Sequence, residues 1–376
     1  MATTGSGRKV IVFGGLGQLG RRFVKILKDD PAYNAIVVAD LRLPTKALES
    51  SMGGNKVTFV THRLGEEPTE NLVQILEGCD CVFSAVTAPL QQATPEQFQR
   101  TNVDGIKALV EGCKKSKSVK GLVMLSSIAV TDHLLPSVDM KESDPLPDIE
   151  SYQSFYDKTK RLGEDIVLGA DEKGGLRTCA LRPSGILCSP QDHVFGNALG
   201  NGLPGFIFAP ASPHPPMDFL DADDLSRAMM LAGAQILAQP DKVGGQAFFV
   251  TKGERINSLK IIELTARDLG WIFVPIPVCI FNVLVKFMAG IYNFRKCLGL
   301  SVKGVPDHLF WTFYRQQLTY DNSKAKDLLG YEPAIKIEET VKRILDQYRV
   351  ENPWKIRLGC FGRCLRSICS RICCCN

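Results

Sequence analysis

A glycine-rich run between a predicted strand and a predicted helix restricts the fold of this chain more than any other feature. The run Gly14-Gly15-Leu16-Gly17-Gln18-Leu19-Gly20 follows the apolar segment 10–14 and precedes a helix expected to reach about Lys28. Glycines here permit a tight turn and let backbone amides approach a pyrophosphate at the positive end of the helix dipole. The run therefore predicts the first crossover of a parallel sheet, with a phosphate-binding site at its carboxyl edge.

An acidic residue at the end of the next predicted strand supports this interpretation. Asp40 ends the apolar segment 35–40, and a carboxylate at that position is suited to hydrogen bonds from an adenosine ribose. It would repel the additional phosphate of NADP, so NAD is the expected dinucleotide. Arg21, Arg22 and Arg42 can offset that repulsion, and NADP therefore stays open.

Short apolar segments alternate with helical patterns through the first half of the chain. Segments that are apolar throughout, rather than at every second residue, are typical of parallel strands covered on both faces. An α/β fold with a doubly wound parallel sheet, of the Rossmann type, is expected for residues 8–185. The predicted strands are 10–14, 35–40, 57–60, 81–86, 121–127 and 178–183, with helices over 70–77 and 102–115 and after Tyr156.

Beyond residue 185 the pattern is less regular, because loops rich in glycine and proline separate shorter elements. We interpret residues 186–350 as a smaller, mixed α/β substrate lobe over the carboxyl edge of the sheet, and residues 351–376 as a tail. The elements expected in the lobe are strands at 217–220 and 247–250 and helices at 222–237, 258–269 and 337–349.

A tyrosine and a lysine four residues apart on a helix place a phenol and an ammonium group on one face. The cation stabilises the phenolate, lowers the pKa of the tyrosine and equips it to exchange a proton with an alcohol or a carbonyl. This spacing occurs at Tyr156/Lys160, Tyr292/Lys296 and Tyr320/Lys324.

Order along the fold distinguishes the three pairs. Only Tyr156 follows, within the α/β domain, a strand that ends in Ser126-Ser127, where a hydroxyl would lie at the carboxyl edge. We therefore predict Tyr156 and Lys160 as the reactive pair and interpret the others as packing or surface residues. Tyr152 is either a residue of the same cleft or a partly buried surface tyrosine.

Together these segments resemble the extended short-chain dehydrogenases, and within them the 3β-hydroxysteroid dehydrogenase branch that includes the sterol-4α-carboxylate 3-dehydrogenases. The resemblance spans about residues 8–350. It is carried by GGLGQLG (14–20), NVDGIKALVEGC (102–113), LSSIAV (125–130), YDKTK (156–160), LRPSGI (181–186), FLDADDLSRA (219–228), GQAFFVTKGE (245–254) and DNSKAKDLLGYEP (321–333).

The resemblance implies a catalytic triad of Ser127, Tyr156 and Lys160. Tyr156 would act as the acid or base, Lys160 would tune it and hold the nicotinamide ribose, and Ser127 would orient the reacting oxygen. Ser127 is preferred to Ser126 because the following Ile-Ala-Val keeps the offset of the family. Hydride would pass between C3 of the substrate and the nicotinamide.

The resemblance also implies a cofactor site that draws on several strand ends. Besides the glycine run, Asp40, Tyr156 and Lys160, it includes Ala85, Asn102 and Pro183. Two departures concern cofactor affinity: Ser84-Ala85 stands where the family usually has His then Ala, and His62-Arg63-Leu64 where Gly-Asp-Leu is expected near the adenine. They keep open a non-catalytic sensor of nicotinamide redox state.

The implied activity is NAD(P)-dependent oxidation of a 3β-hydroxyl, or reduction of a 3-keto group, on a steroid or sterol, with decarboxylation of a 4α-carboxysterol as one variant. Another substrate, such as a nucleotide sugar, is the alternative within the same class. Which sterol is used, and whether an isomerase activity accompanies oxidation, stays open, as does a homodimer.

An apolar segment favours the lipid-soluble substrate. Residues 272–292 contain Lys286 as their only charged residue, and Pro275 and Pro277 interrupt the segment. We expect an interfacial helix beside the substrate entrance, through which an apolar sterol reaches the cleft from a bilayer. A buried core helix is the alternative.

The last residues are rich in cysteine and arginine. Cys360, Cys364, Cys369 and Cys373 recur at about helical spacing in the segment 359–376. Several acyl chains with a basic patch hold a protein firmly at a membrane, so S-palmitoylation is the leading hypothesis. The terminal CCCN formally fits a prenylation box, although its middle residues are not aliphatic. A metal cluster, without any C-x-x-C pair, and an unmodified tail are the alternatives.

Composition and residue spacing limit the classes of partner, location and metal site that the chain can have. The net charge of +5 arises largely from the tail, and no finger spacing or RNA-binding signature accompanies it, so we expect a membrane surface and no nucleic acid. The first residues lack the apolar core of a signal peptide, which favours a reducing location on the cytosolic face of an internal membrane, the endoplasmic reticulum first. The histidines show no ligand spacing and are interpreted as surface or loop residues, with no metal site; Asp223 and Asp224 are interpreted as a helix start.

Overall fold

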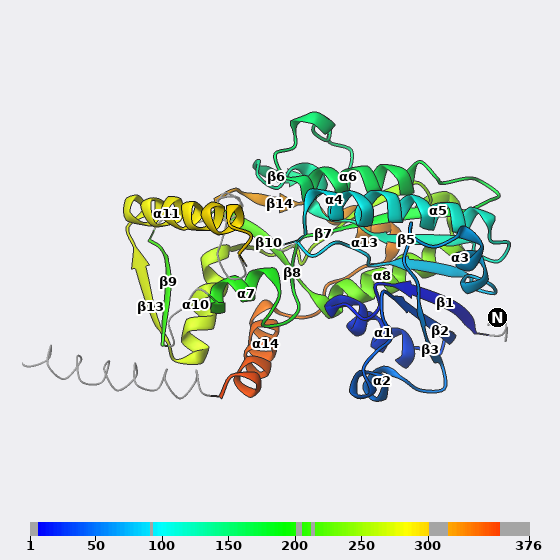
Figure 1. Ribbon diagram of the computed structural model, residues 1–376, viewed down its shortest axis with the longest axis horizontal. Coiled ribbons are helices and arrows are strands. Elements are labelled where there is room, and N and C mark those ends of the chain that lie inside the picture. The colour runs from blue at the N-terminus through cyan, green and yellow to red at the C-terminus, as the bar shows by residue number, and fades with distance from the viewer. Residues whose placement is uncertain (1–6, 91–92, 201–204, 212–214, 301–314, 354–376) are drawn as a thin grey trace, which may run out of the picture.

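A seven-stranded sheet forms the centre of the protein in the computed structural model, which describes residues 7–90, 93–200, 205–211, 215–300 and 315–353 (Figure 1). Every neighbouring pair of strands in this sheet is parallel. The strands, in spatial order, are β11 (Gln246–Val250), β7 (Arg177–Pro183), β5 (Gly121–Leu125), β4 (Cys81–Ser84), β1 (Arg8–Phe13), β2 (Tyr33–Asp40) and β3 (Val57–Thr61). The expected doubly wound sheet is confirmed.

Helices cover both faces of the sheet, which explains why its strands are apolar throughout. The helices on one face are α1 (Gln18–Asp29), α2 (Lys46–Met52), α8 (Ala222–Ala238), α9 (Pro240–Val243) and α13 (Ser323–Leu329). Those on the other are α3 (Thr69–Ile75), α5 (Gly105–Lys115) and α6 (Phe155–Leu168), with the short α4 (Pro95–Phe98) and a π-helical turn, Gln99–Asp104, leading into α5.

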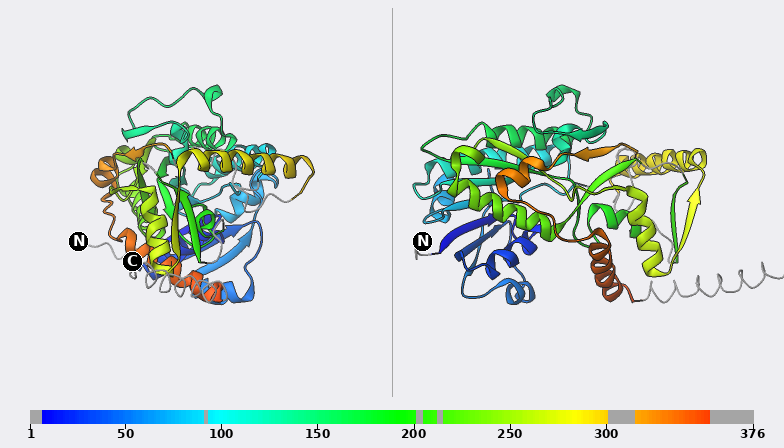
Figure 2. Two further views of the ribbon diagram at one scale, coloured as in Figure 1. Left: turned by 90° about the vertical axis from the view of Figure 1, so that its left-hand side faces the viewer. Right: turned by 180° about the vertical axis from the view of Figure 1, so that it is seen from behind.

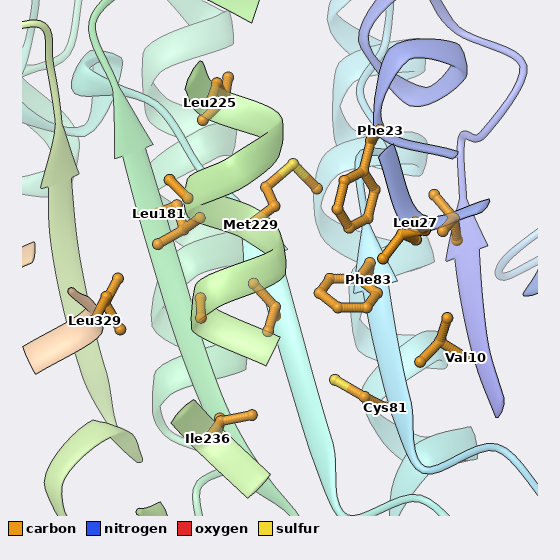
Figure 3. Packing of buried hydrophobic residues seen from close by; sticks show 14 of the residues in the cluster. Val10, Phe23, Leu27, Cys81, Phe83, Leu181, Leu225, Met229, Ile236 and Leu329 are labelled. Atoms are coloured by element: carbon orange, nitrogen blue, oxygen red, sulfur yellow. The ribbon is translucent and has the colours of Figure 1, made fainter. Parts of the chain in front are cut away.

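Close packing of α8 on the sheet depends on small residues. A Cβ at Gly233 would lie 2.3 Å from the Phe83 ring, so only glycine lets α8 approach β4 this closely. Phe83 in turn meets Phe23 of α1 edge to face, with ring centroids 4.8 Å apart. Figure 3 shows Met229 of α8 pointing into the same layer.

A second group of elements forms the lobe at one end of the sheet (Figures 1 and 2). Its main sheet has the order β12-β10-β14-β6, with β8 beside β10, and a separate pair joins β13 to β9. The strands are β6 (Ser137–Met140), β8 (Gly185–Leu187), β9 (Phe206–Pro210), β10 (Pro216–Asp221), β12 (Arg255–Asn257), β13 (Ile272–Ile276) and β14 (Leu318–Tyr320); the helices are α7 (His193–Gly200), α10 (Ser258–Leu269), α11 (Val278–Cys297) and α14 (Ile337–Glu351).

The central sheet and the lobe each contain strands from both sides of residue 185. The strand predicted at 247–250 as part of the lobe is β11, which pairs with β7 and completes the central sheet. That assignment was wrong, because a fully apolar strand does not reveal which sheet it joins. Conversely, β6 lies within the first 185 residues but pairs with β14 of the lobe. A boundary at residue 185 therefore does not separate two independent cores.

The segment predicted as an interfacial helix at 272–292 contains two elements. Residues Ile272–Ile276 form β13, with Pro275 inside it, and the helix begins only at Val278, after Pro277. Proline lacks a backbone N–H and is accepted on an edge strand and just before a helix. Both interruptions therefore fall outside a continuous helix of 20 residues. The cysteine-rich segment 359–376 lies outside the described residues.

Candidate active site

Five of the predicted site residues lie at the carboxyl ends of five adjacent strands. In spatial order they are Pro183 of β7, Ser127 after β5, Ala85 after β4, Gly14 after β1 and Asp40 of β2. Neighbouring strands are about 4.8 Å apart, so the row extends over roughly 19 Å. A row of this length suits an extended dinucleotide, with its reactive end near Ser127 and its adenosine end near Asp40.

The glycine turn has the close backbone packing that its sequence predicts. Gly14 adopts a φ of +75°, and a Cβ there would lie 2.9 Å from the Ala85 carbonyl oxygen. A Cβ on Gly20 would lie 2.3 Å from the Gly14 carbonyl oxygen, so a side chain would separate α1 from β1. Gly17 caps α1 without a side-chain hydrogen bond, and Gln18 and Leu19 form its first turn. The positive end of α1 is thus accessible to an anion.

The Asp40 carboxylate faces this turn. One of its oxygens accepts a hydrogen bond from the Leu16 amide at 2.9 Å and the other from the Leu41 amide at 2.8 Å. Arg22 is directed elsewhere: it pairs with Asp223 at 3.2 Å and donates to the Cys188 carbonyl at 2.8 Å. This pairing makes Arg22 unsuited to neutralising a 2′-phosphate.

Tyr156 lies in the first turn of α6 and contacts the serine that follows β5. The helix begins there because Ser154 accepts a hydrogen bond from the Asp157 amide, an N-cap interaction. The Tyr156 hydroxyl lies close to the Ser127 side chain, and Phe98 packs edge to face on the phenol, with ring centroids 5.8 Å apart. Burial raises the pKa of Tyr156 to about 12, while the Ser127 side chain acts in the opposite direction.

Lys160 lies one turn further along α6 and is almost completely buried. Its Nζ donates to the Leu125 carbonyl at 2.7 Å. Burial lowers the pKa of Lys160 to about 8, with Glu164 opposing that change. The spacing of Tyr156 and Lys160 predicts that the lysine lowers the pKa of the tyrosine; in this structure that pKa is raised, because desolvation of the phenol dominates.

A buried ion pair lies behind Lys160. Arg182 donates to Glu164 at 2.6 Å, and Ser126 donates to the same carboxylate at 2.6 Å. The Ser126 hydroxyl is thus engaged away from the cleft, which leaves Ser127 as the serine in contact with Tyr156. No motif indicated this network, although the spacing of four residues between Lys160 and Glu164 on one helix could have suggested it.

Asn102 supports the site from behind. Its side-chain oxygen accepts from the Ala88 amide at 3.0 Å, and its amide donates to Thr159 of α6 at 3.1 Å. Both ends of this buried side chain are therefore engaged within the chain. Asn102 can influence a bound dinucleotide by holding the loop after β4 against α6.

Tyr320 and Tyr152 have structural contacts away from the Ser127 and Tyr156 side chains. Tyr320 is buried in β14 within hydrogen-bond distance of Thr131 Oγ1, at 3.2 Å, and Lys324 of α13 donates to the Ala247 carbonyl. Tyr292 lies on α11. Tyr152 is buried and donates to the Val130 carbonyl at 2.5 Å. It therefore tethers residues 128–134, the segment that follows Ser127 and that we call the serine segment, rather than lining an open cleft.

His62 and His133 lie in loops, as predicted, but their side chains are engaged with acidic residues rather than exposed. His62 is only 3% exposed, with Nδ1 lying 3.2 Å from Glu67, and His133 contacts Asp157. His214 and His308 lie outside the described residues. No group of three or more metal-ligating side chains occurs in the described part of the chain. Asp221 caps α8, which confirms a helix start at this point.

The fold, with this grouping at its carboxyl edge, defines the class of extended short-chain dehydrogenases. The model of the 3-beta hydroxysteroid dehydrogenase/isomerase family matches residues 11–270, and the chain belongs to that family. The expectation of an oxidoreductase from this family is thereby confirmed.

Curated relatives extend over most of the chain. The 3beta-hydroxysteroid-dehydrogenase/decarboxylase isoform 1 of Arabidopsis thaliana is 27% identical, covering 93% of this chain and 81% of the relative. The decarboxylating sterol-4-alpha-carboxylate 3-dehydrogenase of Candida albicans is 26% identical over 90% of this chain and 97% of its own. The enzyme of that name from Mus musculus is 26% identical over 91% of each chain.

Solved structures share the fold. MoeE5 in complex with UDP-glucuronic acid and NAD aligns with a TM-score of 0.66 and 20% identity, covering 91% of this chain and 99% of that one. A dTDP-glucose 4,6-dehydratase from Streptomyces venezuelae, with NAD bound, aligns with a TM-score of 0.68 and 18% identity, covering 93% and 99%. At this identity the likeness concerns the fold alone.

Proposed function

We propose that this chain is an NAD-dependent dehydrogenase that oxidises the 3β-hydroxyl group of a sterol or steroid. The observation that carries the proposal is the row of residues at five neighbouring strand ends, with Ser127 and the adjacent Tyr156 at one end and Asp40 at the other. Relatives named as sterol and hydroxysteroid dehydrogenases support the substrate class.

The residues present fit NAD. The glycine turn leaves no space for side chains and keeps the start of α1 open, which suits a pyrophosphate. Asp40 would hold the adenosine ribose in place of the Leu16 amide, and Ala85 and Pro183 would border the nicotinamide half. When bound, NAD supplies the acceptor for the hydride that leaves C3 of the substrate.

The chain's own groups handle the proton. Ser127 would hydrogen-bond the substrate oxygen, and Tyr156 would take the hydroxyl proton as the carbonyl forms. A phenol with a raised pKa requires a nearby positive charge to act as a base. Lys160 provides that charge from a buried position, and we infer that its Nζ leaves the Leu125 carbonyl when ribose hydroxyls are offered.

A carboxyl group at C4 would give this oxidation a further consequence. Oxidation of a 3β-hydroxyl beside such a group yields a β-keto acid, which readily loses carbon dioxide. The relatives from Candida albicans and Mus musculus are named as decarboxylating enzymes. We therefore place 4α-carboxysterols first among the candidate substrates.

We further propose a membrane location, which α11 supports. This helix is the one in the described residues that is long and apolar enough to cross a bilayer. Its most exposed apolar residues form one stripe at helical spacing, which we call the α11 stripe: Ile280, Val283, Leu284, Phe287 and Phe294. Lys286 lies near the middle of the helix, where a spanning orientation would place its charge in the bilayer core at a cost of several kcal/mol.

We therefore favour an orientation of α11 along the membrane surface, with the α11 stripe immersed. The Cys/Arg-rich tail, with S-palmitoylation ahead of prenylation, would add to this attachment. The cytosolic face of the endoplasmic reticulum fits a sterol substrate and free buried cysteines such as Cys81 and Cys179.

Purified full-length protein tests the proposal with a panel of 3β-hydroxysterols, with and without a 4α-carboxyl group, and with NAD or NADP. We expect reduced nicotinamide to accumulate with NAD in preference to NADP, most rapidly with the carboxylated sterols. Turnover of UDP-sugars but of no sterol would overturn the substrate class. Binding of NAD without turnover of any member of the panel would favour a redox sensor.

A further inference from the structure

A histidine and an aspartate join the two segments that carry the reactive groups. His133 follows Ser127 by six residues, after the 3-10 turn Ile128–Thr131, and Asp157 directly follows Tyr156. The His133 Nδ1 lies 2.5 Å from Asp157 Oδ2, and the His133 backbone amide donates to the same oxygen at 3.3 Å. The Asp157 carboxylate thus connects the segment after Ser127 with the start of α6.

The Asp157 carboxylate needs this partner. Its side chain is fully buried, and its Oδ1 has no hydrogen-bond partner among the described residues. A buried carboxylate without a donor costs several kcal/mol, so the His133 side chain and amide are the groups that make this position tolerable. Asp132 adds negative charge nearby, and Arg161 and Tyr152 face the same region from α6 and the loop before it.

Strain in the serine segment increases the importance of the contact. Asp132, beside His133, adopts a left-handed backbone with φ of +58°, which is unfavourable for a residue other than glycine. A second tether, from the Tyr152 hydroxyl to the Val130 carbonyl, holds the same segment. Without tethers of this kind, the segment 128–134 would relax and carry Ser127 with it.

We propose that His133 is a positioning residue for the reaction: through Asp157 it fixes the segment after Ser127 against α6 and so keeps Ser127 within reach of Tyr156. The expected effect on turnover rests on the proposed function. The expected effect on residues 128–134 rests on the contacts alone. His133 touches neither Tyr156 nor Ser127 in any contact described for them.

Three variants of the full chain test the role in turnover. His133→Phe keeps a ring but removes the ring nitrogen that contacts Asp157, whereas His133→Asn places an amide group near the position of Nδ1. We expect His133→Phe to lower kcat by roughly 10- to 100-fold while the KM for NAD stays within about 2-fold, because a small displacement of a reactive group has effects of this order. His133→Asn should recover most of the rate. Leu135→Ala, at an exposed residue of the same loop, should behave as the wild type.

A measurement that needs no turnover distinguishes failure of the inference from failure of the proposed function. Amide hydrogen exchange of residues 128–134 should accelerate in His133→Phe and return towards the wild-type rate in His133→Asn. If the wild type oxidises no sterol but exchange changes in this way, the positioning contact stands and the function is wrong. Unchanged kcat and unchanged exchange in His133→Phe would overturn the inference.

Discussion

The proposed role of Lys160 requires a charged side chain in a buried position, and this burial destabilises the folded state. The side chain is 2% exposed, and its burial lowers its pKa from 10.5 to about 8. A shift of this size corresponds to about 3 kcal/mol of folding free energy lost wherever the ammonium is charged in both states. Because burial of this ammonium costs folding free energy, packing alone does not account for a lysine at this position. Its presence therefore supports a functional role.

This cost of burial predicts the effect of Lys160→Met. At pH 7 the variant should be more stable than the wild type by roughly 2 kcal/mol, since about 1 kcal/mol is lost with the hydrogen bond to the Leu125 carbonyl. Between pH 8 and pH 10.5 the unfolded lysine binds a proton that the folded one has released, so the wild type gains stability as pH rises. The advantage of the variant in urea denaturation should therefore shrink from pH 7 to pH 10. A wild type that is more stable at pH 7 would contradict the assigned cost of burial.

At the scale of elements, α11 exposes a row of large apolar residues, whereas α6 and α14 each expose a single one, Phe155 and Val350. Phe287 and Phe294 are each 66% exposed, although aromatic side chains usually dominate the core. Contiguous apolar surface of this kind marks an interaction site. Figure 2 shows that α11 lies at the far end of the lobe, away from β1 and β2 of the central sheet.

Two adjacent residues of α11 provide a matched test of this surface. Phe294→Glu places a charge within the α11 stripe, whereas Asn293→Glu adds the same charge on another face of the helix. We expect Phe294→Glu to reduce flotation of the full chain with anionic liposomes by several-fold, and Asn293→Glu to have little effect. Equal flotation of both variants with the wild type would contradict membrane contact through the stripe.

Some elements could be predicted from the sequence and others could not. The strands β1, β2, β4, β5 and β7 were predictable because buried parallel strands are local apolar runs with helices between them. The division of 272–292 into β13 and α11 was not, since both parts are apolar and the pairing of β13 with β9 joins residues far apart in the chain. The contact of His133 with Asp157 was equally invisible, because no motif relates the loop to α6.

At the scale of the whole molecule, the central sheet is completed by segments that follow the predicted domain boundary. β11, α8 and α13 all come from beyond residue 185, and together they supply a large part of one core layer. Leu225, Met229 and Ile236 of α8 are all buried in that layer (Figure 3). The glycine run and Asp40 were sufficient to predict a dinucleotide fold, but not how the chain returns to the sheet.

This interleaving predicts that residues 1–185 do not form an independent domain. The fragment would expose the face of β4, β5 and β7 that α8 covers and would lack the edge strand β11, so we expect aggregation or a molten state. Near-ultraviolet circular dichroism and urea titration would test this against the full chain. A cooperative urea transition of the isolated fragment would show that the expected boundary at residue 185 is a true domain limit after all.

The central claim is that Tyr156 exchanges the proton while a 3β-hydroxysterol is oxidised with NAD. Tyr156→Phe removes a single oxygen and keeps the ring that packs against Phe98. We predict that its steady-state rate with NAD and a 4α-carboxy-3β-hydroxysterol falls by roughly 100- to 10,000-fold, while NAD affinity, measured by calorimetry, stays within about 3-fold of the wild type. A variant that binds NAD and oxidises the sterol at the wild-type rate would contradict the account.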